Sequence, residues 1–175
     1  DAGVKAYKAF MPKYFADAGK VMDVESRLVH CMVTLQGAKA EDFKPSTVFS
    51  GEGQKATAIE DLVAYVYDES RGAPIKVPQG HTMEKAAFER GKAAFFYKGG
   101  PYDFSCASCH SEDGKRIRLQ DLPNLTQPGP AQAAFSQWPA YRVSQGALRT
   151  MQWRLYDCFR QQRFPELQYL SPTSV

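Results

Sequence analysis

Residues 105–114 read Ser-Cys-Ala-Ser-Cys-His-Ser-Glu-Asp-Gly, and the first six of them decide how the rest of the chain is interpreted. They contain Cys106-x-x-Cys109-His110, the attachment motif of c-type haem. In this motif the two thiols form thioethers with the haem, and the adjacent histidine is the proximal iron ligand. We therefore predict one covalently bound haem c, held by Cys106, Cys109 and His110.

Two other kinds of site use a Cys-x-x-Cys pair. A redox-active dithiol normally follows a strand in a thioredoxin-like βαβ pattern, which this sequence lacks. A zinc site needs a second pair of ligands at short spacing, and none follows His110. Haem c is therefore favoured, and because it is attached on the outer side of energy-transducing membranes, the predicted location is periplasmic.

The composition is that of an ordinary globular protein. Of the 175 residues, 43% are hydrophobic and 23% are charged, and no apolar run is long enough to span a bilayer. The net charge is only +3 and the basic residues are dispersed, so nucleic-acid binding is not favoured. We expect a soluble, mainly α-helical protein.

A helix is predicted ahead of the haem motif, over Thr82–Tyr97, with Thr82 as its N-cap. Its apolar face would consist of Ala87, Phe88, Gly91, Ala94 and Phe95. We expect Gly91 to allow the close approach of another helix and Phe95 to pack near the haem. Beyond the motif, three prolines in residues 120–132 predict a loop, and a further helix is predicted from about 144 to 162.

The N-terminal third contains two more predicted helices. Residues 26–37 form one that ends at Gly37, and residues 50–70 end in a second. The buried stripe of the second should be Ile59, Leu62, Val63, Val66 and Tyr67. Residues 71–81 contain two prolines and two glycines, as a linker would.

The pattern Arg-Leu-x-x-Cys occurs twice, at Arg27–Cys31 and at Arg154–Cys158. This repeat predicts two cytochrome c-like helical domains. We expect the sequence to begin part-way through the first domain. The spacing from His110 to Cys158, counted back from Cys31, would place a matching histidine ahead of Asp1. The predicted division is an N-terminal domain at 1–72, a linker at 73–81 and a haem c domain at 82–175 that lacks its closing helix.

The second axial ligand of the haem iron is usually a methionine or histidine downstream of the motif. Met151 and Cys158 are both candidates, with His81 and His30 less favoured. Spacing alone favours Met151, because Met/His cytochromes are common, and Cys158 would then be an inert apolar side chain. Both would lie on one helical face together with Arg154 and Leu155.

Arg154 gives Cys158 a second interpretation. It precedes the cysteine by one helical turn, where a fixed positive charge should lower the thiol pKa and favour the thiolate. Its guanidinium would also suit an incoming oxyanion. The alternative is a solvated surface arginine.

Several long segments resemble the SoxA subunits of the SoxAX cytochromes of bacterial thiosulfate oxidation. They are residues 14–32, 60–66, 103–110, 114–125 and 138–165. The resemblance implies two cytochrome c-like domains, with Cys158 as the distal haem ligand and Arg154 as the residue that positions the substrate. It also implies that the Cys158 sulfur is commonly a persulfide.

The resemblance also implies a reaction, the oxidative coupling of thiosulfate to a cysteine of the SoxY subunit of SoxYZ. The two electrons would pass through haem to a SoxX-type cytochrome partner, which makes the chain part of an L-cysteine S-thiosulfotransferase. A pure electron-transfer cytochrome c and a structural haem domain remain alternatives. Four further arginines would widen the positive field, pair with haem propionates or simply be solvated: Arg116, Arg118, Arg160 and Arg163.

Cys31 is the position at which members of the family differ. In members with two haems the matching cysteine ligates the second haem, and in members with one haem it forms a disulfide with a cysteine further upstream. This chain shows one Cys-x-x-Cys-His motif and no spare cysteine, so one haem is favoured.

Overall fold

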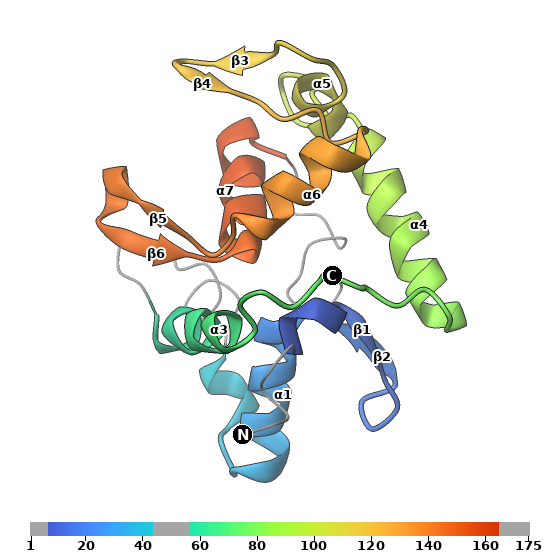
Figure 1. Cartoon of the computed structure of the whole chain (residues 1–175), viewed down its shortest axis with the longest axis vertical. Coiled ribbons are helices and arrows are strands. Elements are labelled where there is room, and N and C mark those ends of the chain that lie inside the picture. Colours follow the sequence, from blue (N-terminus) through green and yellow to red (C-terminus); the bar gives the residue numbers. More distant parts are fainter. Residues whose placement is uncertain (1–6, 44–56, 165–175) are drawn as a thin grey trace.

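The computed structural model describes residues 7–43 and 57–164. The chain is mainly α-helical, as predicted, and contains three small antiparallel hairpins that the sequence did not indicate (Figure 1). The helices are α1 (Val24–Leu35), α3 (Ala58–Glu69), α4 (Thr82–Phe96), α5 (Cys106–His110), α6 (Pro128–Ser136) and α7 (Met151–Gln162). The hairpins are β1–β2 (Lys13–Phe15, Lys20–Met22), β3–β4 (Arg116–Ile117, Gln120–Asp121) and β5–β6 (Ala140–Arg142, Ala147–Arg149). Short 3-10 turns are η1 (Tyr7–Phe10), η2 (Ala40–Asp42) and η3 (Val143–Gln145).

The apolar core lies in the N-terminal part of the chain, residues 7–43 and 57–81. It is formed by Met11, Val24, Ile59, Val63 and Val66, all less than 10% exposed. Helix α1 begins at Asp23, whose side chain accepts a hydrogen bond from the Ser26 amide, and it ends just before Gly37. Gly37 has φ +73°, a conformation that glycine adopts without strain, so the predicted helix end is confirmed.

The buried face of α3 differs from the predicted stripe at one position. Leu62 is 38% exposed, whereas Glu60 is fully buried. Glu60 closes a capping box with Thr57 and turns inward, so the buried face is rotated toward it and away from Leu62. The prediction that Leu62 is buried was therefore wrong, because pattern reasoning excludes a glutamate from a core face.

Helix α4 begins one residue earlier than predicted, with His81 rather than Thr82 as its N-cap. The His81 ring nitrogen accepts a hydrogen bond from the Met83 amide, and the ring stacks on Tyr14 with centroids 3.8 Å apart. The Glu84 carboxylate accepts hydrogen bonds from the Tyr14 and His81 amides, both at 3.0 Å. These contacts attach the start of α4 to the β1–β2 hairpin.

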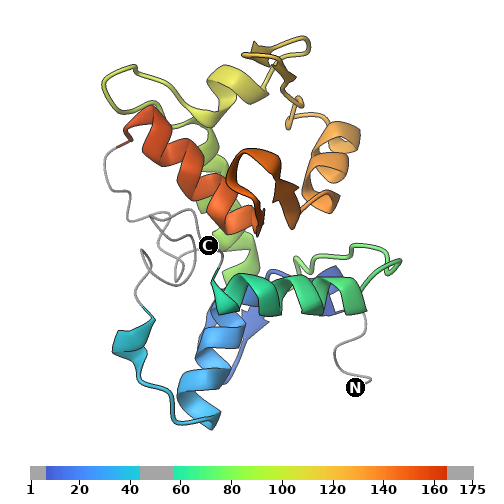
Figure 2. The ribbon, with the colours of Figure 1, turned by 90° about the vertical axis from the view of Figure 1, so that its left-hand side faces the viewer.

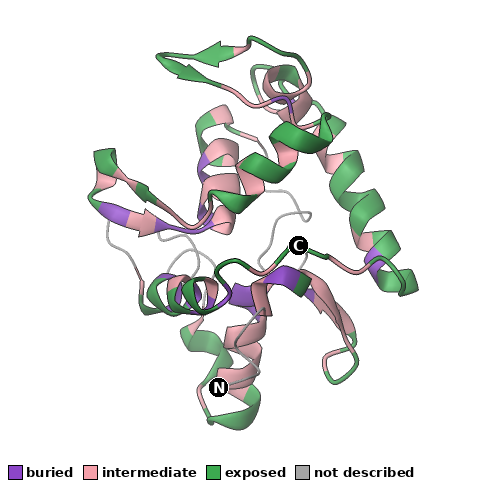
Figure 3. Cartoon of the chain, viewed as in Figure 1, coloured by how far each residue is buried: buried purple, intermediate pink, exposed green. Residues whose placement is uncertain are grey.

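The rest of α4 is largely exposed (Figure 3). Phe88 is 57% exposed, and a Cβ built on Gly91 meets no atom within 4 Å. Among the described residues no helix packs closely against Gly91, so the predicted helix contact at this glycine is not found there. The predicted apolar face is not a buried face of the described part of the chain.

Two predictions in the C-terminal half were wrong. Pro128 and Pro130 do not exclude a helix, because they stand in the first turn of α6, where the missing amide hydrogens cost no helical hydrogen bond. The helix expected from about residue 144 begins only at Met151, after the β5–β6 hairpin turns at Gly146 with φ +60°. Its predicted end at Gln162 is confirmed.

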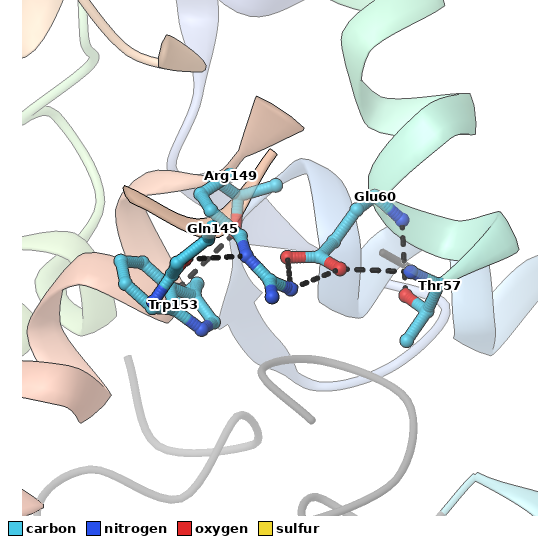
Figure 4. A network of polar contacts seen from close by, with 6 residues as sticks. Thr57, Glu60, Gln145, Arg149 and Trp153 are labelled. Atoms are coloured by element: carbon cyan, nitrogen blue, oxygen red, sulfur yellow. Dashed lines mark hydrogen bonds and ion pairs between the residues drawn. The ribbon is translucent and has the colours of Figure 1, made fainter. Parts of the chain in front are cut away.

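A buried ion pair joins α3 to the segment that leads into α7 (Figure 4). The Arg149 guanidinium lies 3.2 Å from the Glu60 carboxylate, and both side chains are fully buried. Gln145 accepts a hydrogen bond from Arg149 Nε at 3.0 Å, and the Trp153 ring lies under the guanidinium at 5.0 Å. The N-terminal and C-terminal parts are therefore packed against each other through charged groups that lie out of solvent.

Candidate haem and sulfur site

The haem motif forms a single turn of helix, α5, and its start is fixed by two serines. The Ser105 hydroxyl accepts a hydrogen bond from the Ser108 amide at 3.1 Å, and the Ser108 hydroxyl accepts one from the Ser105 amide at 3.0 Å. This reciprocal cap replaces hydrogen bonds that so short a helix cannot supply. It presents Cys106, Cys109 and His110 from one rigid turn.

The His110 ring is oriented by the loop that follows it. Its Nδ1 lies 2.9 Å from the Pro123 carbonyl oxygen, and since a carbonyl only accepts, Nδ1 is the donor. In a neutral imidazole this donor leaves the other ring nitrogen, Nε2, without a proton, as an iron ligand must be. The loop is held in turn by the Leu125 amide, which donates to the His110 carbonyl at 2.8 Å.

Helix α7 ends against the segment that leads into the motif (Figure 2). A Cβ placed on Gly100 would stand 2.8 Å from the Arg163 carbonyl oxygen and 3.0 Å from that of Gln162. Gly100 also has φ +73°, so both the lack of room for a Cβ and the backbone conformation favour glycine at this position. The close contact brings the C-terminal half of α7 next to the haem motif.

Cys158 lies in that half of α7 and is partly buried. Burial raises the pKa of the Cys158 thiol, and Asp157 and Cys109 act in the same direction. The charges of Arg154 and Arg142 act in the opposite direction but do not outweigh burial. The predicted effect of Arg154 on the thiol pKa is therefore confirmed in its sign, but burial outweighs it.

Cys158 lies close enough to the haem motif to act on Cys106, and Cys109 acts on Cys158. Burial raises the pKa of Cys106, and the neighbouring Cys158 adds to this effect. Met151 lies two helical turns earlier on α7, about 10 Å further along the axis and away from the end that meets Gly100. The structure thus brings Cys158, rather than Met151, toward the haem motif.

Arg154 is held on α7 by a carboxylate that three side chains share. Its guanidinium lies 3.5 Å from Asp157, and its side chain is 25% exposed. Asp157 also accepts hydrogen bonds from Arg160 at 2.7 Å and Gln161 at 2.6 Å. The Arg154 contact is the longest of the three.

Two residues of this cluster, Asp157 and Arg142, were not predicted from the sequence. Asp157 had a local signal, since it stands three residues from both Arg154 and Arg160 on one helix. Arg142 had none, because its charge acts on Cys158 from the end of β5, which the pairing of β5 with β6 places before α7. In the described part of the chain no carboxylate lies within ion-pair distance of Arg142.

The other predicted candidates lie in different surroundings. His81 caps α4 at the end remote from the motif, and His30 lies 3.6 Å from Asp17 in the N-terminal part. Arg116 pairs with Asp121 at 2.9 Å on the exposed β3–β4 hairpin, and Arg163 lies 5.9 Å from the Tyr102 ring centroid. Neither histidine is placed to reach an iron bound at His110.

Cys31 lies half-buried on α1, one turn after Arg27. Arg27 is bound to Asp17 at 2.7 Å and stacks over Phe15. The two Arg-Leu-x-x-Cys segments therefore both form helices with the arginine bound to an aspartate. All four cysteines of the chain are free thiols in the structure.

The donor set fits a haem c better than a bare metal ion. Within residues 7–43 and 57–164, no three His, Cys, Asp or Glu side chains come close enough to bind a bare metal ion. From residue 82 to 164, only Ala147 and Trp153 are buried apolar residues, while Phe88, Phe96 and Phe104 are exposed. Apolar surface of this kind, near two anchoring thiols and an oriented histidine, suits a large apolar macrocycle. None of the helices in the described ranges is both long enough and apolar enough to span a bilayer.

Comparison with known proteins identifies the family. Residues 1–75 match the family model described as the SoxA/TsdA cytochrome c domain. The SoxA subunit of L-cysteine S-thiosulfotransferase from Hydrogenophilus thermoluteolus is 49% identical over 172 residues, which cover 98% of this chain and 62% of that protein. The SoxA subunit from Hydrogenobacter thermophilus is 32% identical over 156 residues, which cover 89% of this chain and 54% of that protein.

The fold is shared with a solved structure as well. The crystal structure of SoxXA from P. pantotrophus has a TM-score of 0.73 to this chain, covering 97% of it and 57% of the solved chain at 23% identity. This likeness shows the mainly helical fold, and the chain spans between 54% and 62% of the length of the two SoxA relatives. A cytochrome c domain implies covalently bound haem c, for which Cys106, Cys109 and His110 provide the attachment motif. The sequence matches and the shared fold together show that the chain belongs to the SoxA family of cytochrome c proteins.

Proposed function

We propose that this chain carries the reactive sulfur of a SoxA-type L-cysteine S-thiosulfotransferase. One observation supports this above all: Cys158 lies on the end of α7 that packs beside the haem motif, under the influence of Arg154 and Arg142. The curated relatives bear the name of this activity. An anion that approaches Cys158 meets two cations, of which Arg142 is not paired with any carboxylate of the described residues.

Each of the proposed haem-binding residues has its own role. Cys106 and Cys109 anchor one haem c, His110 is its proximal ligand and Cys158 is the distal ligand. The Pro123 carbonyl fixes the His110 tautomer, and burial shields the Cys158 sulfur from bulk solvent. We further propose that Cys158 carries the extra sulfur of a persulfide.

The proposed reaction joins thiosulfate to a cysteine of a carrier protein, SoxY of SoxYZ. A bond forms between the carrier sulfur and the outer sulfur of thiosulfate, the S–H bond of the carrier cysteine breaks, and one proton and two electrons leave. The electrons require a one-electron acceptor, which is the chemistry that a haem c supplies when bound. Arg154 and Arg142 offset the charge of the dianion as it approaches Cys158.

We also propose the electron acceptor and the location of this reaction. The electrons pass to a SoxX-type cytochrome in a heterodimer, and the location is periplasmic, where haem c is attached. We also propose that residues 1–72 and 82–175 are two cytochrome c-like domains joined by 73–81, which is supported by the matching Arg-Leu-x-x-Cys helices α1 and α7. Residues 165–175 lie outside the described residues.

A pure electron-transfer cytochrome is the second candidate, and one observation favours it. The raised pKa of the Cys158 thiol, caused mainly by burial, is what an inert core cysteine would show. Such a carrier would need haem but neither arginine. The two functions therefore differ in whether arginine variants lose activity.

Arg154→Ala tests the proposed function. Loss of a charged hydrogen bond to an anion costs about 1.5–3 kcal/mol, so we expect kcat/KM for thiosulfate coupling to fall about 10- to 100-fold. The covalent haem content and the absorption spectrum should stay as in the wild type. Steady-state coupling assays with purified carrier protein measure the effect.

Arg160→Ala is the matched control. Arg160 lies on the same helix and binds the same aspartate, but it is 58% exposed and does not act on Cys158. Its variant should retain most of the activity. Full turnover in Arg154→Ala would contradict the proposed role and favour the electron carrier.

A further inference from the structure

Glu25 is a buried carboxyl group that the proposed reaction does not use. It stands in the first turn of α1 and is 2% exposed, and within the described residues neither of its side-chain oxygens has a well-formed hydrogen bond, although the Thr150 hydroxyl lies close enough to act on it. An ionised carboxylate without hydrogen bonds or a counter-charge is costly inside a protein. The group therefore needs either a partner or a proton.

The charged groups around Glu25 offer no partner. Asp23 precedes it by two residues, and Glu60 faces it from α3, so both nearest carboxylates would repel its charge. Arg149 on β6 is bound to Glu60 at 3.2 Å. Tyr67 on α3 is neutral as well, because burial raises its pKa and the neighbouring carboxyl groups of Asp23 and Glu25 act in the same direction.

These surroundings favour the neutral acid. Burial, together with the charges of Asp23 and Glu60, raises the pKa of Glu25 well above its usual range, against an opposite effect of the Thr150 hydroxyl. Burial likewise raises the pKa of Asp23 to about 6, against the hydrogen bonds it accepts from Ser26. The poorly satisfied oxygens and the two facing carboxylates lead to the same conclusion without any pKa, because within the described residues neither oxygen accepts a hydrogen bond from a cation.

Glu25 lies where the start of α1 meets the start of α7. Asp23 accepts a hydrogen bond from Gln152 on the first turn of α7, and Thr150, which acts on Glu25, is the N-cap of that helix. The start of α1 therefore packs against the start of α7, beside the Arg149–Glu60 pair. Any charge that appears on Glu25 lies at the junction between the N-terminal and C-terminal parts.

We propose that Glu25 is a proton-dependent latch between α1 and α7: its protonated side chain keeps the junction closed, and loss of the proton loosens it. The latch does not depend on which reaction Cys158 performs. Opening would release the N-terminal end of α7, the helix that carries Arg154 and Cys158. The chain would thus become less stable, and α7 less firmly held, in alkaline solution.

The sign of the pH effect follows from the raised affinity for a proton. In the unfolded chain Glu25 titrates near its usual pKa of about 4.3. The folded protein keeps the proton to higher pH, so this stabilisation is complete below that value and is lost as pH rises through the folded pKa. Asp23 contributes in the same direction between about 4 and its folded pKa of about 6.

Glu25→Gln in the haem-loaded protein tests the latch. The amide has the shape of the protonated acid but cannot ionise, so thermal unfolding should respond less to alkali. We expect the variant to unfold within about 1 °C of the wild type at about pH 4 and about 3 °C or more above it at about pH 9. The wild type should also show an alkaline change in its haem absorption spectrum that is reduced in the variant.

Two further variants keep the test decisive. Glu25→Leu removes the titrating group altogether, and a flat pH response there supports the latch even if Gln packs poorly. Glu84→Gln is the matched control, because Glu84 is also buried but accepts two amide hydrogen bonds that lower its pKa. It should be destabilised to the same extent from pH 6 to 9. Glu25→Gln and Glu25→Leu proteins that lose stability with pH as steeply as the wild type would overturn the proposal.

Discussion

At the scale of single residues, the state of Cys158 is set by competition between burial and positive charge. Burial is the larger influence and raises the pKa of the thiol, while Arg154 and Arg142 lower it from two different elements. A thiolate at this position therefore depends on a further positive centre, which a haem iron would provide. In the proposed function the same two arginines bind the incoming anion, so their charge has a role even where it does not ionise the free thiol.

Arg142 leads to a prediction of its own. Arg142→Ala should raise KM for thiosulfate and lower kcat/KM about 10-fold or more, because a charged contact with the anion is lost. Arg116→Ala is the control, since that arginine lies on the exposed β3–β4 hairpin and is paired with Asp121. Coupling assays over a range of thiosulfate concentrations separate KM from kcat. Equal KM values in wild type and Arg142→Ala would remove Arg142 from the site.

Residue-level prediction from the sequence succeeded where the signal was local. Arg154 and Cys158 lie four residues apart on one helix, as predicted. The haem-binding role of Cys106, Cys109 and His110 stays a prediction from an equally local motif. Arg142 and the buried Glu25 could not be found in this way. The charge of Arg142 acts on Cys158 from the end of β5, which strand pairing places before α7. A glutamate in a first helical turn is ordinarily read as a solvated group.

At the scale of elements, the junction between α3 and α7 depends on an ion pair rather than on apolar packing alone. Arg149 and Glu60 are both fully buried, and Glu60 also accepts a hydrogen bond from the Thr57 amide that starts α3. Removal of one partner leaves the other charge buried and unpaired, which typically costs about 3–5 kcal/mol. The pair therefore links helix capping in the N-terminal part to the position of α7.

Arg149→Met tests this link. We expect the free energy of unfolding to fall by about 3–5 kcal/mol, measured by urea denaturation at neutral pH. The double variant Arg149→Met/Glu60→Gln should recover most of the loss, because the amide keeps the Thr57 hydrogen bond and carries no charge. A single variant within about 0.5 kcal/mol of the wild type would show that the junction is held by other contacts.

Element boundaries were predicted less well than the elements themselves. Helices α1, α3, α4 and α7 were expected from apolar periodicity, but α6 was taken for a loop because of its prolines. The start of α7 was placed too early, because residues 144–150 carry apolar side chains whose hairpin pairing with residues 140–142 is invisible to a helical pattern. Strand pairing between short segments is a tertiary effect, and local propensity does not encode it.

At the scale of the whole molecule, the apolar core and the candidate site lie in different parts. The core residues come from η1, α1, α3 and their neighbours, whereas the site is formed by α5, α7 and β5. The site is therefore positioned by a few contacts. They are the Arg149–Glu60 ion pair, the hydrogen bond from Gln152 to Asp23, and the close approach of Gly100 to the end of α7. The sequence predicted the mainly helical fold, but not that charged side chains would join the two parts.

The most direct test of this account is low-temperature EPR of the ferric protein, recorded for wild type, Cys158→Ser and Met151→Leu. We predict a low-spin, sulfur-ligated signal in the wild type that persists in Met151→Leu and disappears in Cys158→Ser. Covalent haem should be retained in all three, because Cys106 and Cys109 are intact. A signal that survives in Cys158→Ser and is lost in Met151→Leu would contradict the account. It would make Met151 the iron ligand and the chain an electron carrier.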